Sequence, residues 1–333
     1  MAGHLAAIPM VELWRGGMLE SRHAGHAVIC DAAGQIVEAW GDPDAVIFPR
    51  SSCKMIQALP LVETGAADAV GLTPAHLAFA CASHQGAAMH TKMAAEWLQG
   101  LGMGETDLRC GRHDPYDRVE RDRLIIAHEA SCQYHNNCSG KHAGFLTVKQ
   151  HLDAGPEYVE LDHPVQRAVK EAFEDVTGET NHGHGIDGCS APNFATSLHG
   201  LARAMGAFSG ATGSGNARDK AMHRLTRAMA GHPELVAGEG RACTELMRAM
   251  QGRVAIKTGA EAVFVAIVPA LKRGIAVKIV DGASRASEAV VAALLVRLGV
   301  LDANHPATRK RLDAVQTNCR GIETGVLRLA DGF

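Results

Sequence analysis

The alternation of apolar and polar positions predicts β-strands near both ends of the chain. Two apolar segments, 27–30 and 35–40, flank Asp31-Ala32-Ala33-Gly34, which is typical of a hairpin turn. Residues 262–270 and 274–279 are two further apolar runs joined by a short polar link, so a second hairpin is expected. Both alternating positions of the 262–270 run are apolar, which predicts a strand that is covered on both faces.

Helical periodicity dominates the chain between these strands. Residues 64–250 are mostly helical in pattern, and a further apolar helix is expected over 284–298. A helix should also begin at Ser51, and Pro60 should kink or end it. Loops are expected at 110–117, 132–141 and 181–193.

These elements predict an α/β fold in which strands from the N- and C-terminal parts form one antiparallel sheet around an inserted helical lobe. No internal repeat or linker divides the chain, so residues 1–333 are expected to form a single hydrolase domain. Its sheet lobe would comprise about 11–50 and 255–330, and its helical lobe about 51–254.

Composition narrows the classes of function. A net charge of -3 gives no electrostatic argument for binding nucleic acid or an anionic membrane. No run of about 18 apolar residues occurs, and Met1–Met10 lacks the basic start of a signal segment. Nine cysteines in a long chain indicate free thiols in a reducing compartment. We therefore expect a cytoplasmic protein with no nucleic-acid or membrane partner.

Candidate chemistry begins at Ser51 and Lys54, which at this spacing lie on one face of a helix. In this arrangement a neutral lysine can take the proton of a serine that attacks a carbonyl. Alone, such a pair is more often an N-cap serine and a solvated lysine. Lys257-Thr258-Gly259 follows later, at the head of a strand-like stretch, and this order is typical of β-lactamase-type acyl transfer.

A lysine base has an electrostatic requirement. The pKa of lysine is near 10.4 and must fall by roughly 3 units for the amine to act near neutrality. Burial and a second cation, such as Lys257 beside Lys54, both act in that direction. Arg50 could hold a substrate carboxylate or be a surface arginine. Ser83, at the end of an apolar stretch, could line a pocket or face water.

Two segments concentrate side chains that bind metals. Residues 132–142 and 181–189 are rich in Cys, His and Asn, and thiolates with imidazoles suit tetrahedral zinc. No C-x-x-C pair is present, so a closed structural zinc site is not indicated. A mixed site drawn from both segments and a pocket without metal are the two alternatives.

The motifs in their order resemble the asparaginase II family, the Rhizobium-type L-asparaginases. The similarity spans residues 11–330 approximately, and the blocks together are specific although no single one is. The blocks are Arg50-Ser51-Ser52-Cys53-Lys54, Cys81-Ala82-Ser83-His84, Asp107-Leu108-Arg109-Cys110-Gly111, Asn137-Cys138-Ser139-Gly140-Lys141-His142, Asp162-His163-Pro164, Asp187-Gly188-Cys189, His232-Pro233-Glu234, Val236-Ala237-Gly238-Glu239-Gly240-Arg241, Lys257, Gly259-Ala260 and Ser284 onward.

The resemblance implies a serine β-lactamase/glutaminase-like fold and two serine–lysine tandems. One tandem is Ser51 with Lys54, and the other is Ser83 with Lys257. The implied reaction is hydrolysis of the small molecule L-asparagine to L-aspartate and ammonia. The implied assembly is a homodimer.

The resemblance also implies a zinc ion that helps to position the substrate. Its ligands would be Cys138, Lys141 and Cys189, with a water as the fourth. A lysine must be neutral to bind a metal, and spacing alone would favour His142 over Lys141. The remaining residues implied to lie near the metal or the substrate are His142, Asp187 and Cys243.

Two positions depart from the family pattern without removing a proposed catalytic atom: Cys53 stands where a smaller residue is common, and Ala262 replaces a frequent glycine. The alternatives within hydrolases are a preference for glutamine or action on a β-lactam or D-peptide. From a different class, a zinc- or thiol-based sensor on a hydrolase scaffold is the rival, which the intact serines and lysines disfavour.

Overall fold

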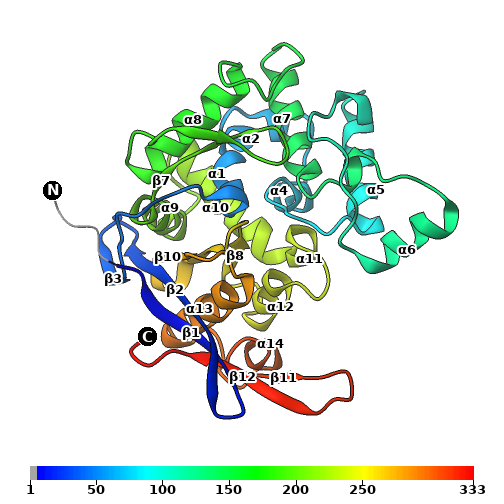
Figure 1. Cartoon of the computed structure of the whole chain (residues 1–333). Helices are drawn as coiled ribbons and strands as arrows, with labels where there is room; N and C mark the ends of the chain where they lie inside the picture. The colour runs from blue at the N-terminus through cyan, green and yellow to red at the C-terminus, as the bar shows by residue number, and fades with distance from the viewer. Residues whose placement is uncertain (1–5) are drawn as a thin grey trace. The chain divides into compact units, whose positions relative to one another are not determined.

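The computed structural model describes residues 6–333, which form two compact units (Figure 1). The sheet unit comprises the described residues up to Ser52 together with Thr196–Gly210 and Glu245–Phe333. The helical unit comprises Cys53–Ala195 and Ala211–Thr244. Residues 1–5, which belong to the start examined for a signal segment and to the predicted domain, lie outside the described residues. The prediction of a single domain stays a prediction.

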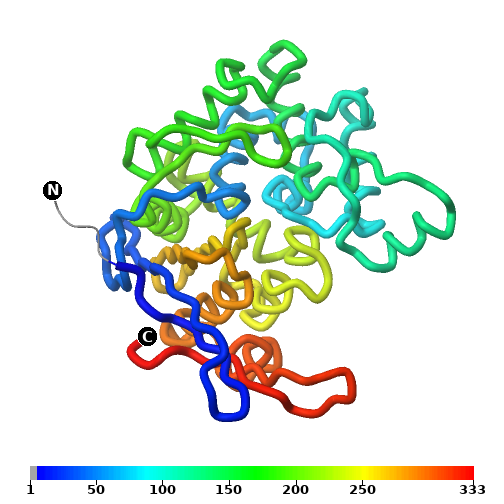
Figure 2. Tube along the Cα trace, viewed as in Figure 1, coloured from blue at the N-terminus to red at the C-terminus, as the bar shows by residue number. Residues whose placement is uncertain are grey.

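The sheet unit contains an eight-stranded antiparallel sheet in which the first and last strands of the chain are neighbours. The order is β11-β12-β1-β2-β10-β9-β8, with β3 also paired to β2. Figure 2 shows the blue N-terminal and red C-terminal segments side by side where β1 pairs with β12. The strands are β1 Ile8–Arg15, β2 Met18–Asp31, β3 Ile36–Trp40, β8 Ala255–Thr258, β9 Val263–Val268, β10 Arg273–Ile279, β11 Ala314–Thr317 and β12 Glu323–Leu329. This confirms the predicted antiparallel sheet.

Both predicted hairpins are present. The β2–β3 turn is closed by the Asp31 carboxylate, which accepts the backbone N–H groups of Ala33 and Gln35 at 2.9 Å each. Gly34 in this turn has φ +82°, a left-handed value that favours glycine. The second hairpin pairs β9 with β10, with Arg273 opposite Val268.

Helices cover the centre of the sheet. The helices α9, Leu198–Gly210, and α13, Ser284–Arg297, both contact β9 and β10. Every residue of β9 is fully buried, which confirms that both faces of this strand are covered. The helix α13 agrees with the predicted apolar helix. The remaining elements of the sheet unit are β4 Val46–Ile47, β7 Thr196–Ser197, the 3-10 turn η4 Pro269–Leu271 and α14 Pro306–Arg309.

A glycine contact sets the distance between α9 and the sheet. A Cβ atom at Gly274 of β10 would lie 2.0 Å from the backbone nitrogen of Gly206 and 2.3 Å from the carbonyl carbon of Met205. Backbone atoms cannot move aside as a flexible side chain can. The Gly274→Ala variant is therefore expected to lose at least about 2 kcal/mol of unfolding free energy, measured by urea denaturation. In Gly100→Ala, where the added Cβ meets nothing within 4 Å, stability should be unchanged or slightly raised. Equal stability of the two variants would contradict the close contact.

The helical unit confirms that the middle of the chain is mostly helical. Its helices are α1 Lys54–Gln57, α2 Leu59–Glu63, α3 Ala66–Ala69, α4 Pro74–Ala80, α5 Ala88–Gly100, α6 Arg118–Ala127, α7 Ser139–His151, α8 Pro164–Thr177, α10 Ala217–Gly231 and α11 Pro233–Val236. Short 3-10 turns η2 Glu105–Asp107 and η3 Gln133–His135 and a strand pair, β5 His184–Ile186 with β6 Pro192–Phe194, complete it. The helix α12, Ala242–Ala249, contains the boundary between the units.

Several local predictions need correction. The segment at Ser51 begins as a 3-10 turn, η1 Arg50–Cys53, and α1 ends before Pro60, as expected of proline. Residues 139–141 are helical because α7 begins at Ser139, and 181–193 contains β5 and part of β6. Lys257 and Thr258 end β8 instead of heading a strand.

Over residues 6–333, no helix is both long enough and apolar enough to cross a lipid bilayer.

Candidate active site

The turn η1, whose residues up to Ser52 belong to the sheet unit, contains two adjacent serines that differ in burial. Ser52 is fully buried, and its hydroxyl donates to the Pro49 carbonyl at 2.7 Å. Ser51 is partly exposed, so its hydroxyl is the more accessible one. Arg50 has φ +52°, which places it in the left-handed region just before these serines. The Ser51 side chain is therefore partly accessible to solvent, whereas the Ser52 hydroxyl is used in a hydrogen bond within the turn.

The end of β8 lies against this turn. A Cβ at Gly259 would lie 2.6 Å from the Pro49 carbonyl oxygen and 3.0 Å from the Ser52 nitrogen, so glycine permits the approach. Lys257, two residues earlier, is buried, and its Nζ donates to the Thr258 carbonyl at 2.7 Å. Within the sheet unit, the Ser51 turn and the strand end that carries Lys257 are therefore neighbours.

In the helical unit, Lys54 is fully buried at the start of α1. Its Nζ donates to the Ala82 carbonyl and, at 3.4 Å, to the Asn137 carbonyl. The first acceptor immediately precedes Ser83, and the second immediately precedes Cys138. The helical unit thus brings the Lys54 amine to both motif segments.

Ser83 lies in an extended segment that follows α4. It is buried, and its backbone N–H donates to the Val236 carbonyl at 2.9 Å. At Gly238, with φ +109°, a Cβ would lie 2.5 Å from the Gln85 side chain. The block around Gly238 therefore packs on the segment that holds Ser83, and the buried Cys243 follows it in α12.

Two thiols and an amine form a buried cluster in the helical unit. Lys141 on α7 donates from Nζ to Cys189 Sγ at 3.0 Å, and the Cys138 thiol is hydrogen-bonded to Cys189. Cys138 Sγ also lies 3.0 Å from Asn137 Oδ1. The hydrogen bond with Cys189, and then burial, raise the pKa of Cys138 to about 12.

The charges in this cluster stabilise each other. The hydrogen bond from Cys138, helped by the Lys141 ammonium and opposed by burial, holds the pKa of Cys189 well below its usual range. Burial lowers the pKa of Lys141, but the two cysteine sulfurs outweigh it and raise that pKa. Both directions favour a Cys189 thiolate paired with the Lys141 ammonium when no metal is bound.

The cluster fits zinc by its donor chemistry. Cys138, Lys141 and Cys189 supply two sulfurs and one nitrogen, which are donor types that zinc accepts. Lys141 must lose its proton to serve as a ligand, so binding is coupled to proton release. No group of three or more His, Cys, Asp or Glu residues able to hold a metal occurs in residues 6–333, so an alternative centre of that kind is not found there.

His142 and Asp187 flank the cluster. Burial, and then the Lys141 ammonium, hold the pKa of His142 well below its usual range, so the ring is neutral. His142 Nδ1 lies 2.8 Å from the Tyr158 hydroxyl, which accepts the Arg109 backbone N–H, also at 2.8 Å. Its Nε2 is buried with no hydrogen-bond partner among the described residues. The Asp187 carboxylate is near enough to act electrostatically on both His142 and Lys141.

The predicted site residues divide between the two units. Arg50, Ser51 and Lys257 belong to the sheet unit. The helical unit holds Lys54, Ser83, Cys138, Lys141, His142, Asp187, Cys189 and Cys243. The pairing of each serine with its lysine stays a prediction.

Sequence reasoning missed the groups that hold these side chains. The Ala82 and Asn137 acceptors for Lys54 are backbone carbonyls, which every residue has, so no residue type marks them. Tyr158 lies 16 positions from His142 and belongs to no helical or strand spacing that would link them. Contacts with a local signal are short-range ones, such as Ser52 with the Pro49 carbonyl three residues earlier and Cys138 with the neighbouring Asn137.

The family follows from comparison of the whole chain. The family described as L-asparaginase II matches residues 11–329. The chain belongs to the L-asparaginase II family. This membership supports an amidohydrolase, an enzyme that cleaves an amide with water and takes a small-molecule amide as substrate. No curated protein is significantly similar to the chain.

Solved structures with a similar trace include a protein called Mglu and two β-lactamase-like proteins. Mglu is 13% identical, with a TM-score of 0.48, and the alignment covers 84% of this chain and 68% of Mglu. A putative β-lactamase from Bacteroides dorei DSM 17855 is 11% identical, with a TM-score of 0.43 and coverages of 77% and 84%. A β-lactamase (Mb2281c) from Mycobacterium bovis is 13% identical, with a TM-score of 0.38 and coverages of 82% and 94%. The predicted α/β class and antiparallel sheet agree with the architecture described above.

Proposed function

We propose that this member of the L-asparaginase II family is an L-asparaginase that hydrolyses L-asparagine to L-aspartate and ammonia. The observation that carries the proposal is the family match over residues 11–329, which includes every candidate site residue. The buried Lys54 supports it, because its amine bonds to two carbonyls and to no carboxylate in residues 6–333. The two carbonyls hold the Lys54 amine against the segments that carry Ser83 and Cys138.

In the proposed reaction, Ser51 is the nucleophile and Lys54 its base. The Ser51 hydroxyl gives its proton to the neutral Lys54 amine while Oγ attacks the side-chain amide carbon of asparagine. Backbone N–H groups at the start of this helical segment would stabilise the oxyanion. The protonated lysine then gives its proton to the leaving ammonia, and water hydrolyses the acyl-enzyme to aspartate.

The other residues are assigned to proton transfer and substrate binding. Ser83 and Lys257 would relay protons, and the reverse assignment, with Ser83 as nucleophile, is the alternative. Arg50 would bind the substrate carboxylate, because arginine forms bidentate contacts with carboxylates. His142, Asp187 and Cys243 would contact the substrate or its surroundings. Zinc held by Cys138, Lys141 and Cys189 would supply a Lewis acid that positions the substrate.

The test is ammonia release from L-asparagine, with L-glutamine compared under the same conditions and nitrocefin hydrolysis as a third assay. The proposal expects turnover of asparagine with a higher kcat/KM than glutamine and no nitrocefin cleavage. Preference for glutamine or nitrocefin would replace the substrate assignment. Zinc binding without turnover of any of the three would favour a sensor function.

The proposed base predicts a pH dependence. An amine acts as a base only after it loses its proton, so kcat/KM should climb as pH rises from neutral into the alkaline range. A carboxylate or imidazole base would instead give a plateau above neutral pH. The measurement is kcat/KM for asparagine from pH 6 to 10 in buffers of constant ionic strength, and a profile flat above neutrality would contradict a lysine base.

The proposal includes a cytoplasmic homodimer. Light scattering coupled to size-exclusion chromatography measures the mass in solution, and a mass near twice the 35.1 kDa of one chain is expected.

A further inference from the structure

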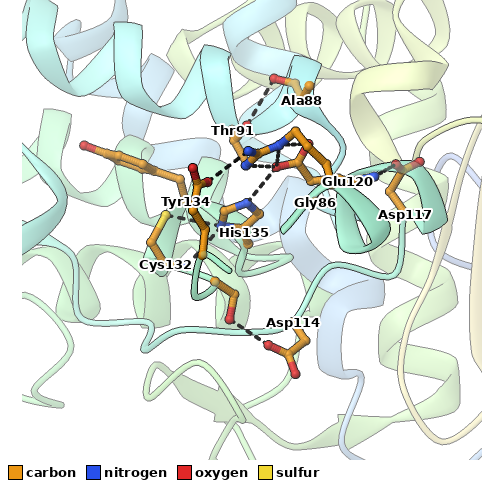
Figure 3. A network of polar contacts seen from close by, with 12 residues as sticks. Gly86, Ala88, Thr91, Asp114, Asp117, Glu120, Cys132, Tyr134 and His135 are labelled. Carbon is orange, nitrogen blue, oxygen red and sulfur yellow. Dashed lines mark hydrogen bonds and ion pairs between the residues drawn. The ribbon is translucent and has the colours of Figure 1, made fainter. Parts of the chain in front are cut away.

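A second cluster of reactive groups lies in the helical unit, at residues that the proposed reaction does not use. Cys132 Sγ lies 3.2 Å from His135 Nδ1, and His135 Nε2 lies 3.3 Å from Glu120 Oε1 (Figure 3). His135 and Glu120 are buried, whereas Cys132 is partly exposed. The order is a thiol, an imidazole and a carboxylate, which is the arrangement that activates cysteine nucleophiles.

The backbone fixes which imidazole nitrogen can act as the base. The Cys132 backbone N–H also points at His135 Nδ1, at 3.0 Å. An N–H can only donate, so Nδ1 carries a lone pair and the ring proton is on Nε2, where it is donated to Glu120. The one lone pair at Nδ1 therefore faces both the Cys132 backbone N–H and the Cys132 thiol, and taking the thiol proton would displace the backbone hydrogen bond.

Glu120 favours a charged imidazole, whereas the Cys132 backbone N–H, which points at Nδ1, opposes a proton on that nitrogen. The hydrogen bond with Cys132, supported by Glu120 and opposed by burial, raises the pKa of His135. The Arg123 guanidinium holds the pKa of Glu120 below its usual range, so this carboxylate is ionised. Arg123 donates to Glu120 at 2.9 Å and is itself paired with Glu129 at 2.9 Å. Asp117 accepts the Glu120 backbone N–H and fixes the start of the helix that presents the carboxylate.

We propose that Cys132 is a reactive thiol and a modification site for small disulfides. The thiol proton moves to His135 Nδ1, and Cys132 Sγ attacks one sulfur of the disulfide. The bond between Cys132 Sγ and that sulfur forms as the S–S bond of the reagent breaks. The leaving thiolate takes the proton from the imidazolium and departs as a thiol, so the small disulfide is the only oxidant required. This chemistry does not depend on amide hydrolysis by the chain.

The rival explanation is that these contacts only shape the turn η3. Cys132 and His135 also cap that turn, since each side chain accepts a backbone N–H of the other residue. A capping role needs no enhanced reactivity. The two explanations therefore differ in the rate at which Cys132 reacts and in the dependence of that rate on His135.

The test compares two cysteines of one chain. Cys319 is exposed, whereas Cys132 is only partly so, and accessibility alone would make Cys319 react faster. The whole chain is treated with oxidised glutathione at pH 7, and the adduct at each cysteine is followed by peptide mass spectrometry. The proposal expects Cys132 to react about tenfold faster than Cys319 or more. An equal or slower rate at Cys132 would overturn it, and this comparison needs no variant that has to fold.

Variants test whether the reaction rate of Cys132 depends on the His135 imidazole. His135→Gln should lower the Cys132 rate to that of Cys319 or below and leave the Cys319 rate unchanged. The matched control is His151→Gln, which removes an exposed imidazole elsewhere in the helical unit and should leave both rates as in the parent chain. An unchanged Cys132 rate in His135→Gln would overturn the role of the imidazole and with it the proposal.

Discussion

The Ser51→Ala variant is expected to lose turnover of asparagine by at least about 1,000-fold while the chain stays folded. Removing a nucleophile eliminates the covalent step, and what remains is catalysis by binding and oxyanion stabilisation alone. Ser51 is partly exposed, so losing its hydroxyl leaves no large cavity and costs little stability. The measurements are kcat from ammonia release and the urea midpoint of unfolding.

The adjacent serine is the matched control. The Ser52 hydroxyl is committed to the Pro49 carbonyl, so Ser52→Ala should lower stability by about 1 kcal/mol and keep most of the activity. Near-normal turnover in Ser51→Ala would remove the nucleophile assignment. If activity is lost instead only in Ser83→Ala, the two tandems exchange roles.

The Cys189→Ser variant is expected to lose the bound zinc. Protein purified without chelator should carry about one zinc per chain by elemental analysis, because two sulfurs and an amine converge in one buried cluster. A serine hydroxyl at position 189 is a far weaker donor than a thiolate, and it removes the anion that pairs with Lys141. Zinc content of the variant should fall to the background of the measurement.

The control for zinc loss is the same substitution at Cys319, a cysteine outside the cluster. Cys319 is exposed and lies in the sheet unit, so Cys319→Ser should keep its zinc. Parent protein that carries no zinc when freshly purified, and takes up none when zinc is added, would contradict the site. Retention of zinc in Cys189→Ser would show that other ligands hold it.

Elements with strong local signals were predicted correctly. The β2–β3 hairpin depends on Asp31 and Gly34, whose chemistry acts over a few residues. The helix α13 and the strands β9 and β10 follow from predominantly apolar patterns. The errors lie where local signals are weak, as at residues 139–141, where tertiary packing makes a segment rich in glycine and polar residues helical.

The residue types of the candidate site could be predicted from the sequence, whereas most contacts between those residues could not. The S-x-x-K and K-T-G motifs indicated Ser51, Lys54 and Lys257 by residue type, and the resemblance to a family implied Ser83; their catalytic roles stay predictions. The Lys141–Cys189 contact joins residues 48 positions apart, and only the resemblance to a family anticipated it. Nothing in the sequence indicated that the pKa of Lys141 would be raised and that of Cys189 lowered, since these shifts depend on burial and on Cys138.

By itself, the sequence determined the class of fold, the hairpins, the family and the residue types available for nucleophilic and metal chemistry. These depend on side-chain periodicity and on motifs that can be read locally. Only the tertiary structure decided which carbonyls accept hydrogen bonds from Lys54 and how closely α9 approaches the sheet at Gly274. It also decided that the Glu120 carboxylate contacts the His135 ring. These contacts join residues far apart in the chain, or use backbone groups that every residue has, so no local pattern specifies them.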